Sequence, residues 1–285
     1  MIYLKSFKLL DAEEEHIVLE CDNRKIYNNF YPLNIFPLKQ LEEINFDSIT
    51  IFYGGNGSGK TTLLNIIAEK IRANRKNKIN KGSYFNIYVK KCNYSFDNES
   101  YDDIKMISSD DIFDYLLDIR AINTGVNRKK ENLSKEWLDA RYSNVTLNSL
   151  NDYENLKKSC DAKKLSMSSY VRNRLTNNNI VEQSNGESAL MYWEKEITEN
   201  SIYILDEPEN SLSAENQLKL KQFIEESARF YNCQFIISTH SPFLLGLKYA
   251  RIYDLDSIPV ATKKWTELAN VRAYYEFFKD NESDF

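Results

Sequence analysis

The chain has 285 residues, of which 42% are hydrophobic and 28% are charged, and this composition is typical of a globular protein with one large domain or two small ones. A net charge of −5 argues against a protein that coats nucleic acid with its whole surface, although a local basic patch stays possible. No run of about 18 apolar residues exists, so we expect no transmembrane helix, and the N-terminus turns acidic too soon for a signal peptide. The four scattered cysteines and two histidines argue against disulfides, zinc and a histidine-rich metal site, so we expect a cytoplasmic protein with reduced thiols.

Two short segments at the N-terminus predict β-strands. Residues 2–9 (IYLKSFKL) and 16–20 (HIVLE) alternate between apolar and polar side chains and are rich in β-branched residues. The loop at 28–37 is aromatic and is interrupted by proline. Such a loop can stack an adenine base, or it can cover the edge of a core, which is the more common use of aromatic loop residues. The candidates for stacking are Tyr27, Phe30 and Tyr31.

The apolar run at 49–53 leads directly into the glycine-rich sequence GGNGSGKTT. The spacing G-x-x-x-x-G-K-T, with a strand before it and a helix after it, is that of a phosphate-binding loop. Glycines let the backbone come close to a phosphate, and the N–H groups of the loop and of the helix N-terminus then point at it. We expect Lys60 to reach the β- and γ-phosphates and the Thr61 hydroxyl to bind Mg²⁺. The residues expected to bind the nucleotide are Asn56, Gly57, Ser58, Gly59, Lys60, Thr61 and Thr62.

A basic run follows the phosphate-binding loop and its helix. The helix is expected to extend from Lys60 to about Ala73, and residues 72–82 then carry several lysines and arginines. We interpret this run as a solvated helix end, where cations interact favourably with the helix dipole, rather than as a nucleic-acid patch. The next predicted elements are strands at 84–90 and 105–107 and a helix at 110–120.

The middle of the chain changes in character. From 123 to 179, Asn, Lys, Ser and Asp dominate and proline is absent. The apolar spacing does not sustain a heptad repeat, so a coiled-coil arm is not predicted. We expect a mostly helical subdomain at about 108–180, inserted into one domain that spans 1–285. Helical segments are predicted at 135–138, 153–158 and 170–175.

The sequence SNGES at 184–188 begins another predicted helix. Ser184 is placed as an N-cap with Glu187 three residues later, which matches a capping box. By itself this pattern indicates only a capped helix.

Two further apolar strands end in polar side chains. The run at 201–205 leads into Asp206 and Glu207, and the run at 234–237 leads into the sequence STHSP, which contains His240. Continuous apolar runs of this kind are typical of strands that are buried on both faces of a parallel sheet. The remaining predicted elements are helices at 214–230 and 265–278 and a strand at 251–255.

The three polar strand ends suit one phosphate site, because ligands of parallel α/β sheets collect at the carboxyl ends of the strands. Asp206 would hold Mg²⁺ through its water shell, and Glu207 would orient and deprotonate the attacking water. His240 would contact the γ-phosphate. Each motif alone has a structural explanation, namely a buried acidic pair or a satisfied histidine, but their order after a phosphate-binding loop favours phosphoryl transfer to water.

The order of these motifs, GGNGSGKTT, SNGES, ILDEPEN and ISTHSP, resembles that of the ABC-type ATPase head. It is closer to the soluble SMC-like and recombination-repair branch than to transporters, and it resembles the small stand-alone bacterial "AAA family" ATPases in particular. The resemblance covers about 28–70 and 180–280. It implies an α/β P-loop NTPase fold with a mostly parallel central sheet, N-terminal antiparallel strands and a helical insert. It places the signature loop on Ser184, Asn185, Gly186 and Glu187, the D-loop on Ser211, Leu212 and Ser213, and the switch histidine on His240.

The resemblance also implies how the protein works. In ABC-type heads the signature helix binds the γ-phosphate that is held by the phosphate-binding loop of a second subunit. We therefore expect an ATP-dependent homodimer with two composite sites, which ATP and Mg²⁺ close and hydrolysis opens. The family suggests a switch in DNA transactions or anti-phage defence, with DNA or an effector protein as the partner and without direct membrane insertion.

The chain departs from the ABC-type pattern at one position, and this departure helps to choose among the possible functions. ABC-type heads carry a glutamine between the phosphate-binding loop and the signature loop, and this chain has none between Thr61 and Glu182. Ser108, Ser109 or Asp110 would stand in its place. The missing glutamine argues against a transporter subunit, because that loop couples to membrane domains. A fused Toprim nuclease is not expected either, because only 45 residues follow His240. Glu207 argues against a module that binds ATP without turnover, and an ATP-gated regulator of a separate effector protein is a further alternative.

Overall fold

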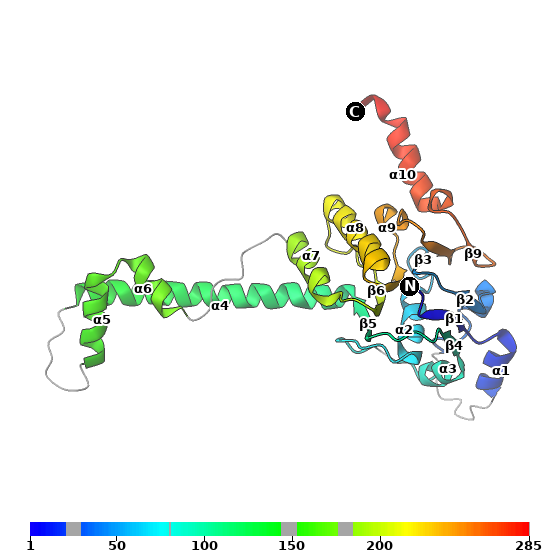
Figure 1. Cartoon of the computed structure of the whole chain (residues 1–285), viewed down its shortest axis with the longest axis horizontal. Coiled ribbons are helices and arrows are strands. Elements are labelled where there is room, and N and C mark those ends of the chain that lie inside the picture. The colour runs from blue at the N-terminus through cyan, green and yellow to red at the C-terminus, as the bar shows by residue number, and fades with distance from the viewer. Residues whose placement is uncertain (21–29, 80, 144–152, 176–184, 285) are drawn as a thin grey trace. The chain divides into compact units, whose positions relative to one another are not determined.

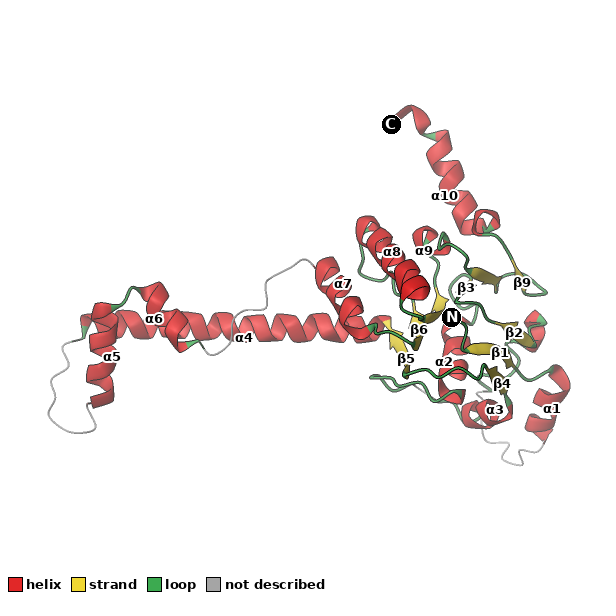
Figure 2. Cartoon of the chain, viewed as in Figure 1, coloured by secondary structure: helices red, strands yellow, loops and turns green. Residues whose placement is uncertain are grey.

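The computed structural model describes residues 1–20, 30–79, 81–143, 153–175 and 185–284, which fall into two compact units. The first unit combines Met1–Phe113 with Asn185–Phe285, and the second is Asp114–Ser184. Figure 1 follows the chain from end to end, and Figure 2 shows that the strands lie in the first unit.

A six-stranded sheet forms the centre of the first unit. Its edge strand β9 runs antiparallel to β8, and all other neighbouring pairs run parallel. The strands β3, β6 and β7 are buried along their whole length, as their continuous apolar sequences predict. This confirms the predicted α/β fold with a mostly parallel central sheet. In spatial order the strands are β5 (Asp103–Ser108), β6 (Ser201–Asp206), β7 (Gln234–Ser238), β3 (Ile49–Tyr53), β8 (Arg251–Asp254) and β9 (Ala261–Thr262).

Helices connect the parallel strands, since two parallel neighbours need a long crossover. Helix α2 (Lys60–Lys70) follows β3 and ends slightly before the predicted boundary, and α8 (Ala214–Phe230) connects β6 with β7 over the predicted range. Further helices of this unit are α7 (Asn185–Glu196), α9 (Pro242–Leu245) and α10 (Ala269–Asp280), and it also contains the short 3₁₀ helices η1 (Pro37–Lys39), η3 (Trp265–Glu267) and η4 (Glu282–Asp284).

A second, three-stranded antiparallel sheet contains the N-terminal strand β1 (Leu4–Lys8). Its neighbours are β2 (Glu43–Asn45) and β4 (Asn93–Phe96), with Phe7 opposite both Ile44 and Tyr94. The predicted N-terminal antiparallel strands are therefore present, but the predicted strand at 16–20 is not one of them.

Residues 16–20 belong to helix α1 (Ala12–Glu20), so the prediction of a strand there is wrong. Asp11 and Glu14 form a reciprocal cap: the Glu14 N–H donates to Asp11 Oδ1 at 2.8 Å, and the Asp11 N–H donates to Glu14 Oε2 at 3.2 Å. Glu15 and Val18, three residues apart, face the interior. The local β propensity of HIVL was thus outweighed by the capping signal upstream of it.

The predicted strand at 84–90 is also wrong, because these residues form helix α3 (Phe85–Lys91). Phe85, Tyr88 and Val89 are buried and follow the i, i+3, i+4 spacing of a helix face. This face packs against α2, and this tertiary packing outweighs the β propensity of the segment.

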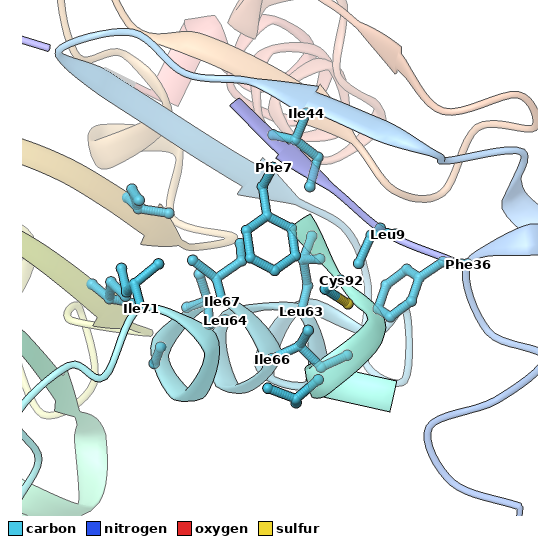
Figure 3. Close-up of a cluster of buried hydrophobic side chains, with 14 of the residues drawn as sticks. Phe7, Leu9, Phe36, Ile44, Leu63, Leu64, Ile66, Ile67, Ile71 and Cys92 are labelled. Atoms are coloured by element: carbon cyan, nitrogen blue, oxygen red, sulfur yellow. The ribbon is translucent and has the colours of Figure 1, made fainter. Parts of the chain in front are cut away.

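The hydrophobic core of the first unit lies where α2 meets both sheets, as Figure 3 shows. Leu63, Leu64 and Ile67 of α2 are fully buried beneath Phe7 of β1 and Ile44 of β2. The phosphate-binding loop that precedes α2 is therefore attached to one of the best-packed elements of the protein.

The Gln234 side chain joins the two sheets. It is completely buried at the start of β7, and its Oε1 accepts the backbone N–H groups of Tyr3 at 3.0 Å and Leu4 at 2.8 Å. Its Nε2 donates to the carbonyl oxygens of Leu4 at 2.9 Å and Asp47 at 3.1 Å. One amide thus satisfies backbone groups of two separate segments.

We expect Gln234→Leu to lower the free energy of unfolding by about 2–4 kcal/mol, because the backbone groups that it satisfies would stay buried without partners. Urea denaturation monitored by circular dichroism measures this. The exposed Gln222 of α8 offers a matched control, since Gln222→Leu should change stability by less than about 0.5 kcal/mol. An equal effect of both substitutions would contradict this role of Gln234.

A buried carboxylate holds the loop that packs on the phosphate-binding loop. Glu15 is 2% exposed, and its Oε2 accepts the N–H of Asn34 at 2.6 Å, while its Oε1 has no partner among the described residues. Burial raises the pKa of Glu15 to about 7, although the hydrogen bond from Asn34 opposes the rise. The next residues, Ile35 and Phe36, lie against Gly59, where an added methyl group would come within 3.2 Å of Ile35.

Because the pKa of Glu15 is raised on folding, the folded protein holds this proton more tightly than the unfolded chain. The stabilisation is full at low pH and is lost as the pH rises through about 7. Between about pH 5 and about pH 8, we expect the wild type to lose on the order of 2 kcal/mol relative to Glu15→Gln, allowing for partial screening. Urea denaturation at both pH values measures this, and the exposed Glu13→Gln should follow the wild type instead.

The second unit is helical over its described residues. The 34-residue helix α4 (Ser109–Tyr142) starts in the first unit and continues through the second, where α5 (Tyr153–Lys164) and α6 (Met167–Arg174) pack against its far end. Trp137 Nε1 donates to the Leu165 carbonyl at 3.1 Å, and the Tyr170 hydroxyl donates to Glu136 at 2.8 Å. The helical segments predicted here lie within these helices, and the helix predicted at 110–120 is the first part of α4. In the part of the chain that the structure describes, no helix is long and apolar enough to cross a bilayer.

Candidate nucleotide site

The phosphate-binding loop connects β3 with α2 and depends on its glycines. Gly57 and Gly59 have φ angles of 78° and 96°, which side-chain-bearing residues rarely adopt. At Gly54 an added Cβ would come within 2.4 Å of Ser58 Oγ. The loop can therefore fold closely over its own helix N-terminus, where N–H groups point outward to an anion.

Lys60 is buried in the middle of this loop. Its Nζ donates to the carbonyl oxygens of Gly54 at 2.7 Å and Gly55 at 3.1 Å. The ammonium group is thus held in the cradle where phosphate oxygens would lie. The Gly55 N–H is in turn fixed by Asp256 Oδ2 at 2.8 Å.

Asp206, the last residue of β6, is buried next to the start of α2. Its Oδ1 accepts hydrogen bonds from the Thr61 hydroxyl at 3.2 Å and from the Ser238 hydroxyl. Burial raises the pKa of Asp206, and both hydroxyl groups oppose the rise. A hydroxyl and a carboxylate side by side are hard oxygen ligands of the kind that Mg²⁺ binds, so this pair fits the ion that the sequence predicted.

Glu207 follows Asp206 and adopts the left-handed region with a φ of 48°. Its N–H donates to the carbonyl oxygen of Ser238 at 3.0 Å, which keeps β6 and β7 together beyond their last residue pair. Its Oε1 lies 3.8 Å from Lys60 Nζ and 3.7 Å from His240 Nδ1. A strained conformation at this position aims a carboxylate at the cradle, and such strain is typical of functional sites.

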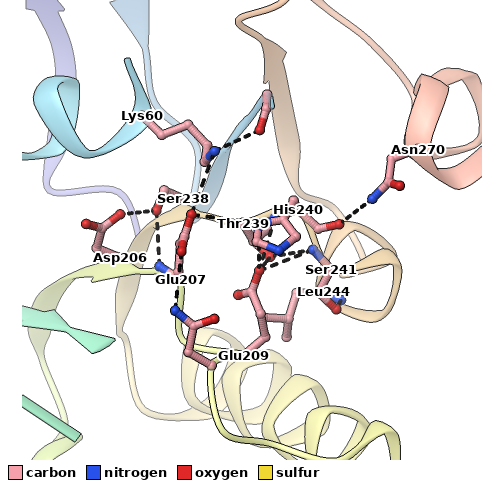
Figure 4. A network of polar contacts seen from close by, with 12 residues as sticks. Lys60, Asp206, Glu207, Glu209, Ser238, Thr239, His240, Ser241, Leu244 and Asn270 are labelled. Carbon is pink, nitrogen blue, oxygen red and sulfur yellow. Dashed lines mark hydrogen bonds and ion pairs between the residues drawn. The ribbon is translucent and has the colours of Figure 1, made fainter. Parts of the chain in front are cut away.

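His240 lies in the turn after β7 and is half-exposed towards the cradle (Figure 4). The backbone of the residue is fixed from both sides: its N–H donates to Glu209 Oε1 at 3.0 Å, and its carbonyl oxygen accepts Asn270 Nδ2 at 2.8 Å. The structure therefore brings together the side chains of Lys60, Asp206, Glu207 and His240, which are far apart in the sequence.

The sequence reasoning missed the role of Glu209. This carboxylate is buried, and besides the His240 N–H its Oε1 accepts the Thr239 hydroxyl at 2.7 Å and the Ser241 N–H at 3.2 Å. Its Oε2 has no partner among the described residues, and burial raises the pKa of Glu209. The second glutamate in ILDEPEN was the available signal. Ser238, Ser241 and Asn270 were missed as well.

The residues expected to form the signature loop are only partly described. Ser184 lies outside the described residues, α7 begins at Asn185, and Glu187 is exposed in its first turn. Ser211 is exposed, with a φ of 68°, in the turn before α8. Ser213 caps α8 by accepting the Asn216 N–H at 3.4 Å. The assignment of these residues to signature loop and D-loop stays a prediction.

Ser108 lies next to Asp206, and which of Ser108, Ser109 and Asp110 stands in place of the missing glutamine stays a prediction. Ser108 and Asp206 are register partners at the ends of β5 and β6. The Ser108 N–H and hydroxyl both donate to Asp111 Oδ2, at 2.7 and 2.9 Å. Ser109 and Asp110 are the first residues of α4. The end of β5 beside Asp206 therefore carries a serine that is held by the buried Asp111.

The aromatic loop residues cover α3. Tyr31 stacks on Phe85 at 6.2 Å, and its hydroxyl donates to Thr62 Oγ1 at 3.2 Å, while Phe30 stacks on Tyr84 at 6.1 Å. These contacts favour the core-covering interpretation over adenine stacking. Tyr27 lies outside the described residues.

Part of the sequence matches a known protein family. The family described as the AAA ATPase domain matches 187–245, which contains β6, α8 and β7. No protein of curated function matches the sequence. The Smc head domain from Pyrococcus furiosus, with an extended coiled coil and bound to the C-terminal domain of ScpA, is 13% identical over 99% of this chain and 100% of that chain, with a TM-score of 0.41. The SMC head domain from Thermotoga maritima is 12% identical over 92% and 99%, with a TM-score of 0.39. Stu0660 of Streptococcus thermophilus is 16% identical over 84% and 76%, with a TM-score of 0.39.

The strand order, the phosphate-binding loop and the acidic strand end define a P-loop ATPase. Within that class the chain is similar to the AAA ATPase domain family over 187–245.

We expect Glu209→Ala to lower the kcat of ATP hydrolysis about 10- to 100-fold, because the turn that positions His240 would lose its common acceptor. The KM for ATP should change little, since the phosphate-binding loop is untouched. Glu209→Gln keeps one acceptor oxygen and should retain most of the activity. Glu215→Ala, at an exposed position on α8, is the control. A rise in KM at constant kcat would contradict this positioning role.

Proposed function

We propose that the protein hydrolyses ATP to ADP and phosphate in an Mg²⁺-dependent reaction, as an ATP-sandwich homodimer that acts as a switch. The observation that carries this proposal is the position of Glu207, whose carboxylate lies 3.8 Å from Lys60 Nζ and 3.7 Å from His240 Nδ1. A carboxylate, an ammonium and an imidazole around one cradle are suited to bind a terminal phosphate and to activate water beside it.

Each side chain has a distinct part in this reaction. Lys60 exchanges the loop carbonyl oxygens for phosphate oxygens and compensates their charge. Thr61 and Asp206 hold Mg²⁺, which, when bound, neutralises charge on the β- and γ-phosphates. Glu207 accepts a proton from the attacking water, and His240 donates a hydrogen bond to the γ-phosphate.

The homodimer is supported by the exposure of the site and by the sequence of α7. Thr61 and His240 are open to solvent, so the groups of one chain surround the phosphates from one side only. The sequence SNGES at the start of α7 resembles a signature loop, and a helix N-terminus is suited to bind the phosphates from the opposite side. A second copy of the chain would thus complete the site.

Two alternative functions are less well supported. A transporter subunit is disfavoured because Ser108 and Asp111, rather than a glutamine, stand beside Asp206. A module that only binds ATP is disfavoured because Glu207 is held in a strained conformation at the cradle. An ATP-gated regulator of a separate effector protein uses the same site and agrees with the proposal.

We expect Glu207→Gln to lower ATP hydrolysis at least 100-fold and to trap an ATP-bound dimer, because binding is preserved while the base is lost. Multi-angle light scattering with ATP and Mg²⁺ should give twice the mass of the monomer. Adding Lys60→Ala to this variant should abolish both nucleotide binding and dimer formation. Glu215→Gln, an exposed substitution of the same chemistry, should behave as the wild type.

Two outcomes separate the parts of the proposal. If Glu207→Gln binds ATP but stays monomeric, the sandwich dimer is excluded while ATP binding stands. If the substitution leaves turnover unchanged, Glu207 is not the base. The biological setting that the motifs suggest, DNA transactions or anti-phage defence, is tested by measuring ATPase activity with DNA, RNA or co-encoded proteins.

A further inference from the structure

A large groove lies outside the nucleotide site, between the end of α2, helix α3 and strand β4. Its volume is about 910 Å³, which is near the upper end of the 300–1,000 Å³ of typical small-molecule pockets. It is mostly polar, and the proposed ATPase reaction uses none of its side chains. The residues that give it its chemistry are Lys70, Arg72, Lys90, Tyr94, Phe96 and Tyr101.

Three cations line this groove in a protein whose net charge is −5. Lys70 Nζ donates to the carbonyl oxygen of Lys90 at 2.9 Å, so its ammonium group is fixed at the wall. Arg72 is exposed directly after α2, where the chain turns with a φ of 59°. The one acidic residue of the lining, Glu69, pairs with Lys81. The groove is therefore a local positive site.

These cations are largely not those of the basic run seen in the sequence. Within 72–82, Arg75 donates to Asn65 Oδ1 at 3.0 Å and Lys76 pairs with Glu196 at 2.6 Å, both away from the groove. Arg72 is the one described residue of this run that lines the groove. The other two cations of the lining are Lys70 of α2 and Lys90 of α3. The interpretation of the run as a solvated helix end thus overlooked a basic site that three elements build together.

An aromatic row also lines the groove. The rings of Tyr94 and Phe96 lie 5.3 Å apart, and Phe96 stacks on Tyr101 at 5.4 Å. Tyr94 is 44% exposed and Tyr101 38% exposed. These residues lie on and just beyond β4, an edge strand of the three-stranded sheet. Adjacent, solvent-accessible ring faces beside cations are the arrangement that binds unpaired bases and their phosphates.

We propose that this groove binds single-stranded nucleic acid. Lys70, Arg72 and Lys90 contact the phosphates, and Tyr94 and Tyr101 stack against bases. A duplex fits less well, because its bases are stacked on one another and cannot reach ring faces inside a groove. An acidic peptide would use the cations and leave the aromatic row without a role. The inference goes beyond the ATPase reaction, since it names a class of partner and requires no bound nucleotide.

The experiment measures binding of a fluorescent oligothymidylate of about 20 nucleotides to the full chain without ATP, by anisotropy at several salt concentrations. We expect Tyr94→Ala to weaken binding roughly 5- to 100-fold, whereas Tyr94→Phe, which keeps the ring, should bind as the wild type. Lys90→Gln should reduce the slope of log affinity against log salt by about 0.7. The control is Tyr249→Ala, because Tyr249 is 91% exposed, follows Lys248 and does not line this groove.

The binding experiment is done without ATP, and its results test the proposed nucleic-acid site directly. Equal affinity of wild type and Tyr94→Ala, with Tyr94→Phe as the check for folding, would overturn it. Tighter binding of a duplex of the same length would do so as well. Displacement of the oligonucleotide by polyglutamate at equal charge concentration would indicate an acidic protein partner instead. Loss of ATPase activity in Glu207→Gln leaves the binding measurement unaffected, so the two proposals can fail separately.

Discussion

The nucleotide site depends on the hydroxyl of Ser238, because this group hydrogen-bonds to both residues of the acidic pair at the end of β6. Strand β7 lies between β3, which leads into the phosphate-binding loop, and β6, which ends in the acidic pair. Ser238 donates to the buried carboxylate of Asp206 and accepts the N–H of Glu207 at 3.1 Å. A buried carboxylate without a hydrogen bond is costly, so this one contact fixes the distance between both ends of the site. The turn with His240 begins directly after it.

Two glutamates in the same sequence motif have opposite environments. Glu207 is partly open and faces Lys60, whereas Glu209 is buried beneath the turn that carries His240. A partly solvated carboxylate can accept a proton from water, and a buried one with three donors can hold a turn in place. The same residue type thus supplies chemistry in one position and geometry in the other, and only the surroundings separate the two roles.

The second sheet and the segments around it hold the parallel sheet and the phosphate-binding loop in place. Gln234 satisfies backbone groups of β1, and Glu15 holds the segment at Asn34 whose next residues pack on Gly59. The polar groups in these contacts are buried, so each needs a protein partner in place of water. The same sheet exposes its edge strand β4, so the element that supports the nucleotide site also offers the aromatic side of the basic groove.

The sequence by itself determined the phosphate-binding loop, the acidic strand end and the parallel sheet, because glycine spacing and continuous apolar runs act locally. It failed at 84–90, where packing on α2 outweighed β propensity, and at 16–20, where the cap formed by Asp11 and Glu14 did so. Only the tertiary structure decided that Glu209 lies beneath His240 and that Lys70, Arg72 and Lys90 share one groove. No local rule relates residues that meet through packing alone, since their proximity depends on how whole elements are placed.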